Sequence, residues 1–144
     1  MISVMMEHLI FRLVSARSRS FIFARMKELD LYGNDLGDDG ASHISTCLTK
    51  IEKLGIRYCK IRASGIKSIS DAISQLPEPM KELDLCGNDL GDDGASHIST
   101  CLSKIEELDI GQCSISASGI KSISDAISKL PEPKPRVDGL EWQY

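Results

Sequence analysis

Four features that would point to common protein classes are missing from this 144-residue chain. No apolar run is long enough to cross a membrane, because Glu7, His8 and Arg12 interrupt the most hydrophobic stretch near the start. The same charges, with no basic segment before them, argue against a secretory signal peptide. No GxxxxGK[ST] loop occurs, and a net charge of −4 leaves no cationic excess for phosphate contacts. We therefore expect no membrane insertion, no nucleotide binding and no nucleic-acid partner.

Signs of catalysis and of bound calcium are equally scarce. No serine or cysteine is spaced as a nucleophile beside a general base, and serines such as Ser70 are expected on a solvated helical surface. The acidic segment 34–40 does not fit an EF-hand, because the twelfth place counted from Asp35 is Thr46 instead of glutamate. We therefore expect no enzyme, no cofactor and no small-molecule substrate.

What the chain does contain is one segment written twice. Residues 26–79 return as residues 80–133, with only nine differences. Self-similarity at a fixed period indicates a stacked array of short structural units. Each 54-residue copy also divides into two related halves, so that four segments begin with an apolar residue and share one pattern. These first residues are Met26, Ile51, Met80 and Ile105.

The shared pattern is LxxLxLxxNxL, with asparagine or cysteine at the ninth place. Within LxL the apolar residues alternate, so Leu29 and Leu31 are expected on the inner face of a short strand and Asp30 on the outer face. The ninth residue follows at the turn, where an inward amide bonds backbone groups of the neighbouring unit that would otherwise be unpaired. These ladder residues are Asn34, Cys59, Asn88 and Cys113.

The segment that returns to the next strand has the three-and-four spacing of a helix. In the first unit the apolar stripe is Ala41, Ile44, Leu48 and Ile51. In the second it is Ile66, Ile69, Ile73 and Leu76. We expect Asp38 and Ser64 to cap these two helices, and Pro77 to end the second one. Strand, turn and helix repeated four times predict an α/β solenoid, a fragment of a right-handed horseshoe with parallel strands on the concave side and helices on the convex side.

These segments resemble the leucine-rich repeats of the ribonuclease-inhibitor type. The phrase LxLxxNxLGDDGA, at Leu29–Ala41 and Leu83–Ala95, is similar to repeats near the C-terminal ends of NOD-like innate immune receptors. The resemblance implies a protein-binding scaffold, usually intracellular, with no catalytic residues. The chain departs from those receptors because it has no nucleotide-binding domain.

The repeats divide the chain into three parts. Residues 1–25 are not a repeat; they are a poor N-terminal cap, the remnant of a truncated longer gene, or a transit peptide. Residues 26–133 are the four repeats. Residues 134–144 are a tail or a partial fifth strand, with Val137, Leu140 and Trp142 at its first, fourth and sixth places.

Histidine and cysteine also follow the repeat. The five cysteines all fall at repeat positions, which favours reduced thiols and a cytoplasmic protein. His43 and Cys47 lie four residues apart, as some zinc ligands do. Their copies, His97 and Cys101, would lie two units away with another helix between them. We therefore expect no metal site.

The differences between the two copies carry the main functional clue. Seven of the nine lie on or just after the strands, and only those at Thr49 and Gln75 belong to the helical side. Solenoids bind partners on their concave face, so we interpret this concentration as diversification of a recognition surface. The predicted concave-face binding residues are Tyr32, Lys53, Gly55, Arg57, Tyr58, Asp84, Glu107, Asp109 and Gln112.

The sequence thus predicts an intracellular protein-interaction module that binds through its concave face. Two alternatives remain. One is an inhibitor or a GTPase-activating factor that grips a basic enzyme, because acidic residues gather at Glu82, Asp84, Glu106, Glu107 and Asp109. The other is a truncated fragment of a larger receptor with no activity of its own.

Overall fold

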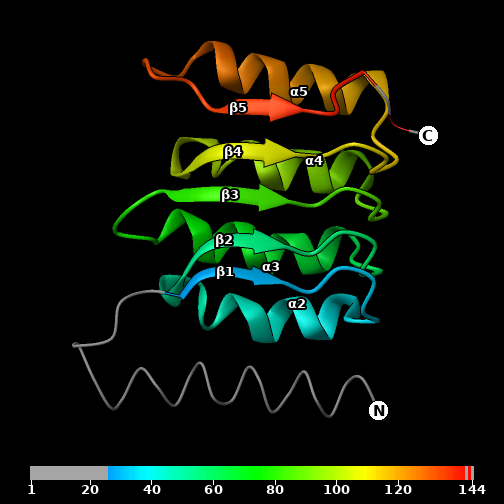
Figure 1. Ribbon diagram of the computed structural model, residues 1–144. Coiled ribbons are helices and arrows are strands. Elements are labelled where there is room, and N and C mark those ends of the chain that lie inside the picture. The colour runs from blue at the N-terminus through cyan, green and yellow to red at the C-terminus, as the bar shows by residue number, and fades with distance from the viewer. Residues whose placement is uncertain (1–25, 142, 144) are drawn as a thin grey trace.

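The computed structural model describes residues 26–141 and residue 143 of the chain. The predictions about residues 1–25 and about Trp142 lie outside the described residues. Five parallel strands lie side by side in chain order, which confirms the predicted α/β leucine-rich repeat architecture (Figure 1). The strands are β1 (Met26–Asp30), β2 (Ile51–Gly55), β3 (Met80–Asp84), β4 (Ile105–Asp109) and β5 (Arg136–Asp138).

Helices form the second layer, behind the sheet (Figure 1). In the described residues, four α-helices alternate with the strands, and short 3-10 helices end the first and third units. The elements are α2 (Gly37–Ser45), η1 (Leu48–Lys50), α3 (Ala63–Ser74), α4 (Gly91–Ser99), η2 (Leu102–Lys104) and α5 (Ala117–Ser128). We call each strand with its return segment a coil; the five coils are 26–50, 51–79, 80–104, 105–133 and 134–143. Within the described residues, no helix is both long and apolar enough to span a membrane.

The core runs between the two layers. Leu29, Leu54, Leu83 and Leu108 stand opposite one another in the register of adjacent strands, and each is at most 7% exposed. Isoleucines from the helices complete the packing: Ile44, Ile66, Ile69, Ile73 and Ile98 have no exposed surface. This core fixes the inner and outer faces of every strand, and so fixes which residues reach the open face of the sheet.

The ladder residues bond backbone across coils. Asn88 is buried; its Oδ1 accepts the Cys59 and Ile61 N–H groups, and its Nδ2 donates to the carbonyls of Ile56 and Leu85. The cysteines follow the same logic more weakly, since the Cys59 thiol donates to the Leu31 carbonyl of the preceding coil. Cys113 does the same to Leu85. Asn34 donates to the carbonyl of Leu31, within its own coil.

The helix caps differ from the prediction. Leu36 precedes α2 without a side-chain cap, and Arg62, not Ser64, precedes α3. Asp38 instead reaches the next coil, where it accepts the Arg62 N–H at 2.8 Å and the Ser64 hydroxyl at 2.6 Å. Asp92 accepts the N–H of Ser116, the copy of Arg62, and also the hydroxyl of that same serine. The aspartates therefore cap the helix of the following coil rather than their own.

Three smaller predictions were also wrong. α2 ends at Ser45, so that Ile51 at the end of the predicted stripe is the first residue of β2. Ser70 is buried, at 1% exposure, because the side of α3 that carries it is covered by the next coil. Val137 pairs with Leu108, which puts it at the fourth place of the last strand and not the first. The fifth coil begins at residue 134 and so keeps the 54-residue period from Met80, whereas the prediction began it three residues too late.

Candidate functional site

The open face of the sheet presents two rows of side chains that cross the strands. The third places of the coils are paired in register, and so are the fifth places. We call these ten residues the strand face. They are Glu28, Lys53, Glu82, Glu107 and Arg136 in one row, and Asp30, Gly55, Asp84, Asp109 and Asp138 in the other. Five predicted binding residues therefore lie on one surface.

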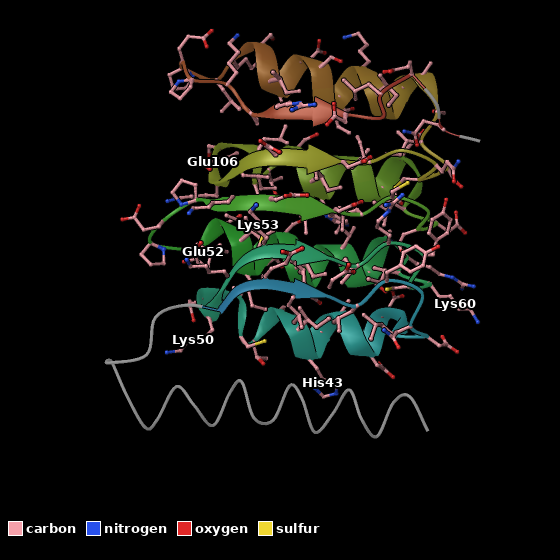
Figure 2. The ribbon with its side chains drawn as sticks, viewed as in Figure 1. His43, Lys50, Glu52, Lys53, Lys60 and Glu106 are labelled. Carbon is pink, nitrogen blue, oxygen red and sulfur yellow. The ribbon has the colours of Figure 1, made fainter. Side chains whose placement is uncertain are left out.

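Opposite charges meet where the second coil borders the third. Lys53 Nζ lies 3.8 Å from Glu82 Oε2, and Arg57 Nε lies 3.4 Å from Asp84 Oδ2. The nearby Asp84 carboxylate raises the pKa of Arg57. Side chains in both pairs are partly exposed, so each pair contributes little to stability and stays accessible to a partner. Figure 2 shows Lys53 on the sheet and Lys60 beyond the carboxyl ends of the strands.

The aspartates of the strand face also have a local structural role. Asp30 accepts the N–H of Tyr32 at 3.0 Å, and Asp84 accepts the N–H of Cys86 at 3.1 Å. Asp109 makes the same bond to Gly111. Burial raises the pKa of Asp84, and the neighbouring Asp109 carboxylate adds to this effect, while the Cys86 N–H and Arg57 oppose it. The pair of carboxylates thus forms an acidic strip whose repulsion a cation would relieve.

Beyond the strand ends, two exposed tyrosines and an arginine form a cluster, which we call the aromatic cluster: Tyr32, Arg57 and Tyr58. Tyr32 is 60% exposed and Tyr58 is 42% exposed. Their rings meet edge to face, with centroids 5.8 Å apart and planes at 80°. The Arg57 guanidinium lies 5.8 Å from the Tyr32 ring centroid. Aromatic and guanidinium groups of this kind supply large contact area at low cost in conformational entropy.

Tyr58 is held across three coils. Its ring lies against Gly87, where an added Cβ would come within 2.4 Å of the ring. Its hydroxyl donates to Gln112 Oε1, in the coil beyond. Tyr58 and Gln112 both have a left-handed backbone, with φ of 51° and 52°, whereas the equivalent places in the first and third coils are Gly33 and Gly87. A bulky residue in this conformation is uncommon and concentrates backbone strain on this surface.

Gly55 contributes space and no side-chain contact. A Cβ at this position would lie 3.1 Å from Asp30 Oδ1, which is a tight contact. In the second copy the equivalent residue is Asp109, so that the aspartate row is interrupted only at the second coil. The gap lies beside the aromatic cluster and gives the surface a local change of shape and charge.

A depression of about 620 Å³ beside Tyr58 was missed by the sequence prediction. Lys60 and Arg62 line it together with acidic residues, and Lys60 Nζ lies 3.5 Å from Asp35 Oδ2. Both cations are among the nine positions that differ between the copies, where Ser114 and Ser116 replace them. The same signal that selected Arg57 and Tyr58 therefore could have found Lys60 and Arg62.

The cysteines are buried in the described structure and none forms a disulfide. Burial raises the pKa of Cys47 and of Cys101 to about 11, and that of Cys113 to about 12. Among residues 26–141 and 143, no group of three or more histidine, cysteine or acidic side chains is placed to hold a metal ion. His43 is exposed on the first coil, while Cys47 faces the core.

The sequence of this chain is similar to a known repeat family and to two groups of known proteins. Residues 26–45, 78–99 and 101–124 match the Leucine Rich repeat family. The chain is 34% identical over 109 residues to the ribonuclease inhibitor of Sus scrofa, which is 70% of this chain and 24% of the inhibitor. It is 28% identical over 110 residues to the Mus musculus ribonuclease inhibitor, which is 71% of this chain and 24% of the inhibitor.

The second group of relatives consists of NACHT, LRR and PYD domains-containing proteins. The chain is 28% identical over 103 residues to the Homo sapiens NACHT, LRR and PYD domains-containing protein 13, which is 66% of this chain and 10% of that protein. The chain therefore spans about a quarter of the length of the inhibitors and a tenth of this larger relative.

Proposed function

Because this chain is a leucine-rich repeat protein of the ribonuclease-inhibitor type, we propose that it is a protein-interaction module that binds a partner protein through its strand face and aromatic cluster. One observation carries the proposal. The large hydrophobic side chains that are exposed in the described part of the chain are Tyr32 and Tyr58, and these two rings touch. Paired exposed aromatics beside an arginine have the composition of binding hot spots.

The proposed contacts fall into two groups of different chemistry. Tyr32, Arg57 and Tyr58 supply aromatic area and directional hydrogen bonds, with Gln112 behind them to hold the Tyr58 hydroxyl. The strand face supplies charge, with Lys53 on the second coil and acidic residues on the third and fourth. Those acidic residues are Glu82, Asp84, Glu107 and Asp109. A partner would therefore contact side chains of both charges at the second coil and negative side chains at the third and fourth coils.

The proposal extends to organisation and location. The interaction module is residues 26–133, with residues 1–25 as a non-repeat segment and 134–144 as a tail that contains the fifth strand. The proposed compartment is the cytoplasm, supported by the five cysteines, which are all buried and free of disulfides. Burial raises the pKa of four of these thiols, those of Cys47, Cys59, Cys101 and Cys113. The proposed partner is a protein, and no cofactor, nucleic acid or membrane takes part.

A second candidate function is regulation of a basic enzyme, as an inhibitor or a GTPase-activating factor. The acidic strip and the glutamates beside it support this function, because Asp84 stands opposite Asp109 and Glu82 opposite Glu107 in the sheet. Like charges held side by side favour a cationic ligand. Relatives named ribonuclease inhibitors agree with a function in the inhibition of an enzyme. The remaining alternative, a fragment of a larger receptor without independent activity, agrees with the small share of each relative that the chain covers.

Site-specific photo-crosslinking tests the proposal. A benzoylphenylalanine at position 32 should crosslink to a discrete partner in lysate from the native source, and the same probe at Lys67, on the exposed side of α3, should not. The double change Arg57→Gly and Tyr58→Gln copies the fourth coil, so the chain should still fold. It should remove the crosslink from position 32. Equal crosslinking from positions 32 and 67, or a crosslink that survives the double change, would contradict binding through the aromatic cluster.

A further inference from the structure

The depression beside Tyr58 has a copy two coils further along the array. We call the first the Lys60 depression; the charged residues that line it are Asp35, Asp38, Lys60, Arg62 and Asp89. The second, the Ser114 depression, has a volume of about 400 Å³ and is lined by the 54-residue copies of the first four, namely Asp89, Asp92, Ser114 and Ser116. The acidic residues therefore recur, whereas the two cations of the second coil become serines. Arg62 lines both depressions, but Lys60 lines the first one only.

The turns at these positions do not need the two cations. Lys60 and Ser114 have the same left-handed backbone, with φ of 59° and 57°. The backbone N–H of Arg62 donates to an aspartate of the preceding coil at 2.8 Å, and that of Ser116 makes the same bond at the same distance. Because both copies fold alike, the ammonium of Lys60 and the guanidinium of Arg62 are not required to form the array.

The aspartates around the Lys60 depression leave its cations accessible. Both carboxylate oxygens of Asp38 are bonded to the start of α3, by the Arg62 N–H and the Ser64 hydroxyl. Asp35 lies 3.5 Å from Lys60 Nζ, but the two side chains are 66% and 74% exposed, so this pair is weak. A carboxylate brought by a partner can therefore replace Asp35 beside Lys60 at little cost.

The surroundings of the Lys60 depression favour a single negative charge on a protein. Tyr58 belongs both to the depression and to the aromatic cluster, so a partner on that cluster has further residues above the depression. Figure 2 shows Lys60 beyond the carboxyl ends of the strands, on this side of the molecule. Asp35 and Asp89 line the depression from the first and third coils, where they would repel a polyanion such as nucleic acid or an anionic membrane.

We propose that the Lys60 depression binds an aspartate or glutamate side chain of the partner protein, with the carboxylate between the ammonium of Lys60 and the guanidinium of Arg62. This inference rests on the proposed function and adds the chemistry of one partner group. A guanidinium offers paired N–H donors to a carboxylate, and the lysine adds a second positive charge. Since the Ser114 depression has no lysine, the pair of cations also fixes the register of the partner along the array.

Carbodiimide coupling tests the position of the partner's carboxylate. The reagent activates a carboxylate, and a lysine amine in contact with it then forms an amide as the activated group leaves. In complexes captured from lysate of the native source, Lys60 should couple to an aspartate or glutamate of the protein that is crosslinked from position 32. Peptide mass spectrometry identifies the two joined residues. Lys67, which is exposed on α3, is the control and should not couple to that protein.

Charge variants test the sign of the group that the depression binds, with the yield of the crosslink from position 32 as the readout. Asp35→Asn removes the competing carboxylate and should raise the yield by about twofold or more. Lys60→Ser with Arg62→Ser copies the Ser114 depression, so the chain should fold, and the yield should fall by about fivefold or more. The matched control is Lys67→Ser with Lys121→Ser, which removes two positive charges from the helical side and should change the yield by less than about 1.5-fold.

Each of three results would overturn this inference and leave the proposed function standing, provided that Arg57→Gly with Tyr58→Gln still removes the crosslink. The first is a yield that does not rise with Asp35→Asn; a fall would assign the depression to a basic group of the partner. The second is a double serine variant that behaves like its lysine control. The third is a captured complex in which Lys60 forms no amide with the partner. Absence of any crosslink from position 32 would overturn the proposed function and this inference together.

Discussion

Gln143 repeats, at the end of the array, the four backbone hydrogen bonds that Asn88 makes two coils earlier. Its Oε1 accepts the N–H groups of Cys113 and Ile115, and its Nε2 donates to the carbonyls of Ile110 and Gly139. The partners are the 54-residue copies of those that Asn88 bonds. Gln143 lies one residue beyond the copy of Asn88, and its extra methylene makes up the difference in reach.

The first prediction is that Gln143 stabilises the last coil. Gln143→Ala should lower the free energy of unfolding by about 1–3 kcal/mol, because partly buried N–H and carbonyl groups of the fourth coil lose their partner. Urea unfolding measures the change, and hydrogen exchange should show the loss of protection at Cys113 and Ile115. Glu141→Ala, at an exposed neighbouring position, is the control and should change stability by less than about 0.5 kcal/mol. Equal effects of the two substitutions would mean that Gln143 does not stabilise the fifth coil.

The second prediction concerns the aspartates that cap the helix of the following coil. Bonds from the hydroxyl and N–H of Ser116 lower the pKa of Asp92 in the folded protein. Its stabilising contribution is therefore present above the ordinary aspartate pKa and is lost as the pH falls through the lower folded-state value. Asp92→Asn should reduce the fall in urea midpoint between about pH 5 and about pH 2.5.

The control for this experiment is Asp93→Asn, at the next residue of α4, which is exposed and makes no bond of this type in the described structure. Asp93→Asn should leave the pH dependence of the urea midpoint as it is in the wild type. If Asp92→Asn has the same small effect as Asp93→Asn, the cross-coil cap does not contribute to acid stability.

The sequence was sufficient to predict the features that repeat. Leu54 and Leu83 fall at the fourth places of their segments, and the structure pairs them in adjacent strands. Asn88 could be placed inward because an amide at a fixed interval after a strand has backbone groups of the next coil within reach. Because four segments align, each of these placements follows from the shared pattern and does not depend on any single residue.

Features that depend on contact between coils could not be predicted from the sequence of a single segment. Asp38 has the position and chemistry of a cap for its own helix, and only the stacking brings it to Ser64, 26 residues away. Ser70 looks like a solvated helix residue until α4 covers it. Gln143 was missed because it departs from the 54-residue period by one position, and its longer side chain compensates for that shift.

The third prediction follows from a cavity of about 430 Å³ beneath the fifth coil. The first place of the second, third and fourth coils is filled by a buried apolar side chain, as with Met80, which has no exposed surface. In the fifth coil that place is Lys134, which is exposed; its Nζ donates to the Ser128 carbonyl instead. Leu102, Ile105 and Leu130 are consequently left lining the cavity.

Lys134→Met should therefore fill the cavity in the way that Met80 fills its own coil. The free energy of unfolding should rise by about 1 kcal/mol, since the gain from apolar burial exceeds the loss of one exposed hydrogen bond. Urea unfolding measures the effect, and a crystal structure of the variant would locate the side chain. Lys129→Met, at an exposed position on the last turn of the helical segment, should not stabilise the protein. Equal stability of the two methionine variants would show that the cavity is not available to the residue at position 134.

The last prediction separates folding from binding at Tyr58. The left-handed backbone at this residue, with φ of 51°, is a conformation that glycine adopts at the equivalent places 33 and 87. Tyr58→Gly relieves that strain but loses the ring contact with Tyr32 and the bond to Gln112. These effects oppose each other, so the free energy of unfolding should change by no more than about 1 kcal/mol. The crosslink from position 32 to a partner should nevertheless be lost. On this proposal the left-handed backbone at Tyr58 holds an exposed ring for the partner to contact and does not stabilise the array. Ser114→Gly, at a left-handed residue of the fourth coil (φ of 57°) that is outside the proposed binding residues, is the control for the backbone effect and should retain the crosslink. If Tyr58→Gly keeps the crosslink, or Ser114→Gly removes it, the aromatic cluster is not the centre of the recognition surface.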